Sequence, residues 1–278
     1  MTTNSSGLIQ LGKRLLFVCL LVAGLASALG CASKVAGVGP AGGKGEMITA
    51  SDEPDARRRA RIRLELAVGY FEQGQTTIAL DELKQSIASD PTFGEAYNLR
   101  GLIYMRLNDR PFAEESFRKA LAMNPQNANV VHNLGWLLCQ QARYPESLTL
   151  FSQALANPQY GERAKTLMAQ GLCQMGAGRP ADAEASLLKS YEFDAGNPVT
   201  AYNLATLLFQ RGDYVRAQFY VRRLNNSELA NAESLWLGIK VERRMNNRDA
   251  MLQLATQLQK RFPQSRESAS YARSAFDE

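Results

Sequence analysis

From residue 56 to the C-terminus, apolar residues recur with helical spacing, and few residues interrupt the pattern. The pattern also repeats at a fixed interval. Pro91 and Pro125 lie 34 positions apart, as do Gly101 and Gly135. Self-similarity at this period is typical of a helix pair that recurs along the chain. One such pair cannot bury its apolar face alone, so we expect the pairs to stack on one another.

The period and the residue types resemble the tetratricopeptide repeat. That repeat has a small residue at position 8, Ala at position 20, an aromatic residue or Leu at position 24 and Pro near position 32. The second unit matches with Gly101, Ala113, Phe117 and Pro125, whereas the last three units fit less closely. The resemblance implies an all-α, right-handed superhelix of about six helix pairs with a concave groove. The expected units are residues 60–93, 94–127, 128–163, 164–197, 198–230 and 231–264, followed by a C-terminal helix.

Small residues at positions 8 and 20 have a physical reason. We expect them where the two helices of a unit cross closely, because a larger side chain there would force the backbones apart. The larger residues then fill the space between neighbouring units.

The N-terminus has the pattern of a secretory signal. Lys13 and Arg14 precede an apolar stretch of about 15 residues, which is short for a bilayer span of about 20 residues. The stretch ends in Ala28-Leu29-Gly30-Cys31, which resembles the lipobox of bacterial lipoproteins, although Ala28 stands where that motif usually has Leu. The resemblance implies a signal peptide at residues 1–30 and lipid on Cys31. An uncleaved anchor or a plain secretory signal remains the alternative.

Two further features concern the membrane. Ala32, rather than Asp, follows Cys31, and by resemblance to lipoprotein sorting signals this favours the outer membrane, with the protein facing the periplasm. Residues 31–55 are rich in Gly, Ala, Ser and Pro, so we expect a flexible tether between the lipid and a folded body at residues 56–278.

Composition excludes some classes of function. The net charge is +5, and loss of Lys13 and Arg14 leaves 30 basic minus 27 acidic residues, or +3. The positive charges form no long patch of the kind that binds nucleic acid. One basic cluster occurs at Arg57, Arg58, Arg59, Arg61 and Arg63. It is either a solvated helix turn or a contact for anionic lipid or an acidic partner.

No residues suggest catalysis. The chain has one histidine, His132, and no second histidine that could share a metal ion with it. His132 falls at a groove-facing position of the third unit. The Gly-Ala-Gly sequence at 176–178 falls at a turn between helices, where Gly is common. We therefore expect a non-enzymatic protein without a cofactor, metal ion or small-molecule substrate.

Two cysteines, Cys139 and Cys173, lie 34 positions apart in the first helices of adjacent units. Because the periplasm is oxidising, a disulfide between the third and fourth units is one hypothesis. Two buried thiols are the other.

The candidate binding residues occupy positions 2, 5, 9 and 12 of the first helices, which line the groove in this repeat family. They are Leu64, Val68, Phe71, Asn98, Leu102, Met105, His132, Trp136, Met168, Leu172 and Met175. An apolar, Met-rich lining with aromatic anchors suits a hydrophobic peptide segment or an amphipathic helix. If the register is shifted by one residue, the same side chains belong to the core between helices instead.

Several stretches resemble the PilW/PilF family of type IV pilus biogenesis lipoproteins, the pilotins. They are residues 63–71, 124–128, 131–136 and 234–239. The resemblance implies that the protein binds the secretin subunit of the type IV pilus and helps it to reach the outer membrane and to multimerise. The alternative is a repeat lipoprotein that serves β-barrel assembly or regulates peptidoglycan hydrolases.

Overall fold

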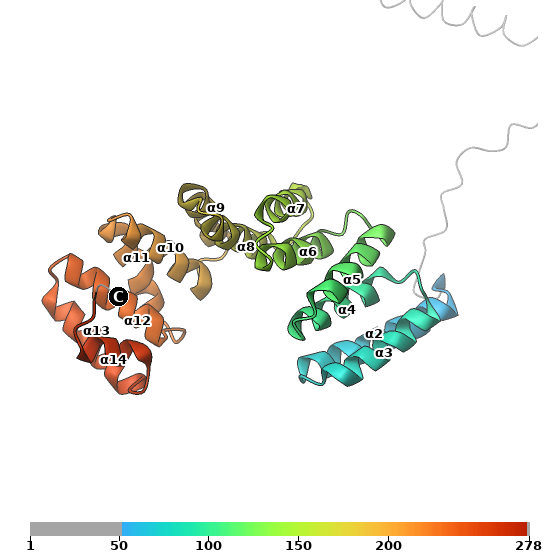
Figure 1. Cartoon of the computed structure of the whole chain (residues 1–278), viewed down its shortest axis with the longest axis horizontal. Helices are drawn as coiled ribbons and strands as arrows, with labels where there is room; N and C mark the ends of the chain where they lie inside the picture. The colour runs from blue at the N-terminus through green and yellow to red at the C-terminus, as the bar shows by residue number, and fades with distance from the viewer. Residues whose placement is uncertain (1–51, 277–278) are drawn as a thin grey trace, which may run out of the picture. The chain divides into compact units, whose positions relative to one another are not determined.

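The structure is a computed structural model that describes residues 52–276, and within these residues it contains 13 α-helices and no strand. Twelve helices form six consecutive pairs, and the thirteenth, at the C-terminal end, packs against the last pair (Figure 1). The pairs are α2 (Asp55–Glu72) with α3 (Thr76–Ser89), α4 (Gly94–Arg106) with α5 (Arg110–Met123), α6 (Ala128–Gln140) with α7 (Tyr144–Ala156), α8 (Arg163–Gly176) with α9 (Pro180–Phe193), α10 (Pro198–Gln210) with α11 (Tyr214–Asn225), and α12 (Ala232–Arg244) with α13 (Arg248–Arg261); α14 is Arg266–Ala272.

Each first helix packs against the second helix of its own unit, and each second helix packs against the first helix of the next unit. The first helices also contact one another from α2 through α4, α6, α8 and α10 to α12. They therefore form one continuous layer. The prediction of an all-α array of about six tetratricopeptide helix pairs is confirmed.

Polar side chains mark where several first helices begin. Asn127 caps α6 by accepting hydrogen bonds from the backbone of Asn129 and Val130, and Asn197 caps α10 in the same way. Asn231 and Ser234 form a reciprocal capping box at the start of α12. These caps satisfy backbone N–H groups that have no partner inside the helix.

The turn inside each unit contains one residue in the left-handed region. These residues are Gly74, Asn108, Ala142, Gly178, Gly212 and Asn246, with φ between 56° and 86°. Gly adopts this conformation without strain, and Asn tolerates it better than other residues do. Ala142, at φ 59°, is the residue in this set that fits it least well.

The core is shared between units. One cluster joins Ala67 and Leu83 of the first unit to Ile103 of the second, and the next joins Phe117 of the second unit to Leu137 of the third. Full burial of such a side chain contributes about 1.5–3 kcal/mol. Because each of these two clusters spans two units, they hold the first helices of the first three units, α2, α4 and α6, together.

Four of the five arginines in the basic cluster near the N-terminus form ion pairs. Arg57 pairs with Asp90, Arg58 with Asp55, Arg61 with Glu53 and Arg63 with Glu82. These ion pairs favour the solvated helix turn over a lipid contact.

Several features expected near the N-terminus lie outside the described residues. They are the signal peptide at 1–30, Cys31 and the tether up to residue 51. The first described helix begins at Asp55. Among residues 52–276, no helix is both long enough and apolar enough to span a bilayer.

Candidate protein-binding surface

Ten of the eleven candidate groove residues are half-buried or exposed, and all lie on first helices. We call them the first-helix surface. It comprises Leu64, Val68 and Phe71 on α2, Asn98, Leu102 and Met105 on α4, Trp136 on α6, and Met168, Leu172 and Met175 on α8. Nine of these side chains are apolar, so the layer of first helices presents a strip that suits a hydrophobic segment.

Most of these side chains also pack inward. Leu102 touches the core clusters on both sides of α4, Trp136 packs against the cluster around Phe151, and Met168 and Met175 pack against the core of the fifth unit. The sequence offered groove lining and inter-helix core as alternatives for these residues. In the structure one part of each such side chain packs in the core and another part is accessible. Packing on one side holds the exposed side in place, which lowers the entropy lost when a partner binds.

Polar groups fix the arrangement of neighbouring first helices. The Asn133 side chain on α6 donates a hydrogen bond to Asn98 Oδ1 on α4, at 3.0 Å. Arg106 lies over the ring of Phe71, 5.3 Å from its centroid, and donates to the carbonyl of Phe71 at 3.1 Å. These contacts join the first, second and third units along the same face.

His132 is a correction, because the sequence placed it in the groove and the structure buries it, with 4% exposure. The third unit is two residues longer than the second, and its closing loop carries the buried residue Tyr160. Thr166 Oγ1 lies 2.8 Å from His132 Nδ1 and 2.8 Å from the Tyr160 hydroxyl. Burial, with a smaller effect of Lys165, lowers the pKa of His132 to about 4. The imidazole is therefore neutral at pH 7 and has a structural role.

Cys139 and Cys173 are brought together by the contact between α6 and α8. The structure joins them in a disulfide, with Cα atoms 5.8 Å apart. Cys173 is fully buried and its sulfur lies 3.4 Å from Ser147 Oγ, whereas Cys139 is half-buried beside the same cluster as Trp136. Oxidation of this pair in the cell stays a prediction.

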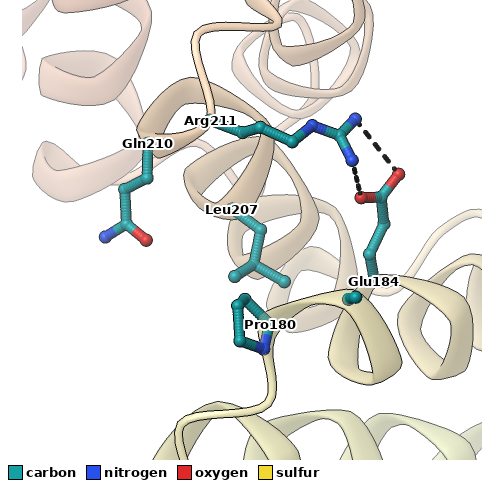
Figure 2. A pocket seen from close by; sticks show the side chains of 6 residues that line it. Pro180, Glu184, Leu207, Gln210 and Arg211 are labelled. Carbon is teal, nitrogen blue, oxygen red and sulfur yellow. Dashed lines mark hydrogen bonds and ion pairs between the residues drawn. The ribbon is translucent and has the colours of Figure 1, made fainter.

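A shallow hollow of about 370 Å³ lies between α9 and α10. Figure 2 shows Leu207 and Pro180 on its wall and the ion pair between Arg211 and Glu184 above them. Glu184 also accepts a hydrogen bond from Arg216 at 3.0 Å. Asp213 also pairs with both Arg211 and Arg216, so two carboxylates balance two arginines where the fourth unit meets the fifth.

The candidate binding residues chosen from the sequence include none from the first helices of the fifth and sixth units, α10 and α12. Phe209 on α10 packs against the same core as Met175, so the apolar face continues beyond α8. On α12, Leu235 and Ile239 at positions 5 and 9 of the sixth unit are fully buried, and Lys240 lies over the rings of Phe209 and Trp236. Packing against residues of α13 and α14 buries these two side chains, and the spacing of the last units gave no signal of it.

Comparisons with known proteins agree with this architecture. The tetratricopeptide repeat family matches residues 94–127 and 116–149. The type IV pilus assembly protein PilF of Pseudomonas aeruginosa is 30% identical over 204 residues, which cover 73% of this chain and 81% of PilF. The chain belongs to the PilF/PilW family.

Two solved structures of PilF/PilW proteins have the same fold. The structure of Pseudomonas aeruginosa PilF gives a TM-score of 0.73 at 28% identity, covering 80% of this chain and 100% of that one. The structure of PilW, described as a widely conserved type IV pilus biogenesis factor, gives 0.71 at 30% identity, covering 77% and 98%. The protein is therefore a tetratricopeptide-repeat protein of type IV pilus biogenesis, with a fold that presents surfaces to other proteins.

The described residues contain no group of three or more His, Cys, Asp or Glu side chains placed to hold a metal ion. What the PilF/PilW fold offers here is the first-helix surface, an apolar strip on a rigid layer.

Proposed function

We propose that this protein binds the secretin subunit of the type IV pilus through its first-helix surface and promotes delivery of that subunit to the outer membrane and its multimerisation. Membership of the PilF/PilW family carries the proposal, because it assigns the chain to pilus biogenesis. The apolar, pre-packed face of α2, α4, α6 and α8 supports it by offering a site for a hydrophobic segment.

The mechanism requires binding energy and a change of location, and no bond of the partner is broken. A lipid on Cys31 would anchor the protein to the outer membrane, and a tether ending near Asp55 would keep the helical body in the periplasm. While the first-helix surface covers an apolar segment of the secretin subunit, that segment is protected from aggregation. Release would then occur where subunits are concentrated enough to assemble.

The test is the state of the secretin in cells that lack this gene. Membranes would be separated by density, and secretin oligomers would be measured by native electrophoresis. We expect unassembled or mislocalised secretin in these cells. The full-length gene should restore normal assembly and localisation, and a Cys31→Ser variant should not. Normal secretin rings in the deletion strain would reject the proposal and direct attention to β-barrel assembly or to peptidoglycan hydrolases.

A further inference from the structure

Two cations on α12 lie over aromatic rings. Lys240 Nζ is 5.7 Å from the ring centroid of Phe209 on α10 and 5.7 Å from that of Trp236. One turn later, the guanidinium carbon of Arg243 is 4.1 Å from the ring centroid of Phe276. Phe276 stacks on Trp236 with centroids 5.3 Å apart. The five side chains form a continuous group, which we call the aromatic–cation cluster.

Neither cation has an acidic partner within residues 52–276, where the aromatic rings are their contacts. Arg222 on the neighbouring helix differs, because its Nε lies 2.6 Å from Glu242 Oε1. Lys240 is half-buried, and burial lowers its pKa. Cation–π contacts offset part of the lost hydration, and no acidic side chain among residues 52–276 pairs with these N–H donors.

The helix dipole explains only part of this arrangement. Cations near the C-terminal end of a helix are favourable, and Arg243 is in the last turn of α12. A fully exposed side chain would serve that purpose without loss of hydration. The half-buried position of Lys240 between two rings instead resembles a binding site whose cation is already oriented.

The surrounding charges define where an anion would lie. Burial raises the pKa of Tyr202 on α10, and Glu233 and Glu267 near the start of α12 and α14 raise it further. Glu233 and Glu267 therefore repel an acidic ligand at the N-terminal end of α12, and Lys240 and Arg243 attract it toward the C-terminal end. Because Phe209 shares a core with Met175, this end continues the apolar face of α8.

We propose that Lys240 and Arg243 form a carboxylate-binding site for an acidic stretch of the polypeptide whose apolar residues occupy the first-helix surface. This inference rests on the proposed function in taking a protein segment as the ligand. The aromatic rings hold the two cations at fixed positions, and each cation donates charge-assisted hydrogen bonds to a carboxylate. A bound segment would thus have apolar residues followed by Asp or Glu.

The test uses the full-length chain in detergent and two fluorescein-labelled peptides of the same length. Both peptides carry three Leu residues, and they end in four Glu or in four Gln. Fluorescence anisotropy should show that the Glu peptide binds about tenfold or more tightly than the Gln peptide. Lys240→Gln and Arg243→Gln should each weaken binding of the Glu peptide about tenfold, and 0.5 M NaCl should weaken it as well.

Lys260→Gln is the matched control, because Lys260 is an exposed cation on α13, the second helix of the same unit. It should leave Kd unchanged, and circular dichroism should show equal helical content and Tm in all three variants. Equal binding of the two peptides would overturn the inference. So would Lys240-dependent binding of phosphatidylglycerol vesicles without any binding of the Glu peptide, which would assign the site to lipid headgroups.

Binding of purified secretin subunit separates this inference from the proposed function. If secretin binds equally well to wild type and to the Lys240→Gln, Arg243→Gln double variant, the carboxylate site is rejected and the proposed function stands. If secretin does not bind the wild type while the Glu peptide does, the proposed function fails and the site remains.

Discussion

Gly101 on α4 lies directly against the ring of Phe117 on α5. A Cβ atom added to Gly101 would fall 2.5 Å from Phe117 Cε1, closer than real Cβ contacts come. In the next two units the residues of the equivalent pair are also 16 positions apart. A Cβ at Gly135 would meet Phe151 at 3.0 Å, and one at Gly171 would meet Leu187 at 2.7 Å. The small residue at position 8 therefore sets how closely the two helices of a unit approach.

Gly101→Ala should lower the free energy of unfolding by about 1–3 kcal/mol, because Phe117 is fully buried and its ring has no free space to enter. Gly69 in α2 is the matched control, since a Cβ there meets nothing within 4 Å. Gly69→Ala should stabilise by up to about 1 kcal/mol through helix propensity. Urea unfolding of both variants measures the difference, and equal effects would refute the close-approach argument.

The repeat was predictable because steric packing imposes residue types at fixed positions. Gly101, Phe117 and their equivalents could be recognised from the sequence because few other residues fit such a crossing. The left-handed turn residue was less apparent. Gly74 and Asn108 are typical of that conformation, but Ala142 is not, so nothing in the sequence identified the turn after α6.

Ala142→Gly should stabilise the protein by about 1 kcal/mol, because Gly adopts φ near +59° without the clash that a Cβ causes. Gly212→Ala, at φ 86° in the fifth unit, should destabilise by a similar amount. Thermal unfolding followed by circular dichroism would show Tm shifts of opposite sign. A lower Tm for Ala142→Gly would mean that flexibility gained in the unfolded chain outweighs relief of strain.

His132 should make the protein less stable in acid. Its pKa is about 4 when folded, against about 6.5 when unfolded, so between these values the unfolded chain binds a proton that the folded chain does not. The contribution is fully present above about pH 6.5 and is lost as pH falls toward 4, by up to about 3 kcal/mol. Urea unfolding from pH 7.5 to 4.5 should show this loss.

His132→Gln provides the comparison, because Gln keeps a polar group near Thr166 but does not titrate in this range. Carboxylates contribute equally to both proteins, so the difference between the two stability curves isolates His132. Parallel curves from pH 7.5 to 4.5 would show that the imidazole titrates alike in the folded and unfolded chains.

The candidate surface was less predictable than the fold. Positions 2, 5, 9 and 12 identified half-buried or exposed residues through α8, except for His132. This residue is buried beside Thr166, which also contacts Tyr160 in the longer loop of the third unit. At the other end, packing against α13 and α14 buries Leu235 and Ile239 and moves the accessible face of α12 to Lys240. Both differences arise from contacts between separate elements, which a single repeat register does not contain.

The disulfide between Cys139 and Cys173 should stabilise the protein by about 2–4 kcal/mol, because it closes a loop of more than 30 residues in the unfolded chain. Dithiothreitol should lower the Tm of the wild type but not that of a Cys139→Ala, Cys173→Ala variant. Alkylation of unreduced, denatured protein followed by mass spectrometry checks the bond itself. Alkylated Cys139 and Cys173 peptides would show that the thiols are free.

Trp136→Asp should abolish most secretin binding while preserving the fold. Trp136 is a half-buried aromatic residue at the middle of the first-helix surface, and such residues dominate binding energy, with losses of about 2 kcal/mol or more on truncation. Val215→Asp on α11 is the matched control, because Val215 is an apolar residue with 69% exposure on a second helix. Co-purification of secretin subunit with each variant, alongside Tm and helical content, separates binding from stability.

Because Leu102 packs into two core clusters, Leu102→Asp should lower Tm as well as binding, whereas Trp136→Asp should affect chiefly binding. If secretin binds the Trp136→Asp variant normally but not the Val215→Asp variant, the partner occupies the second helices and the first-helix surface is not its site.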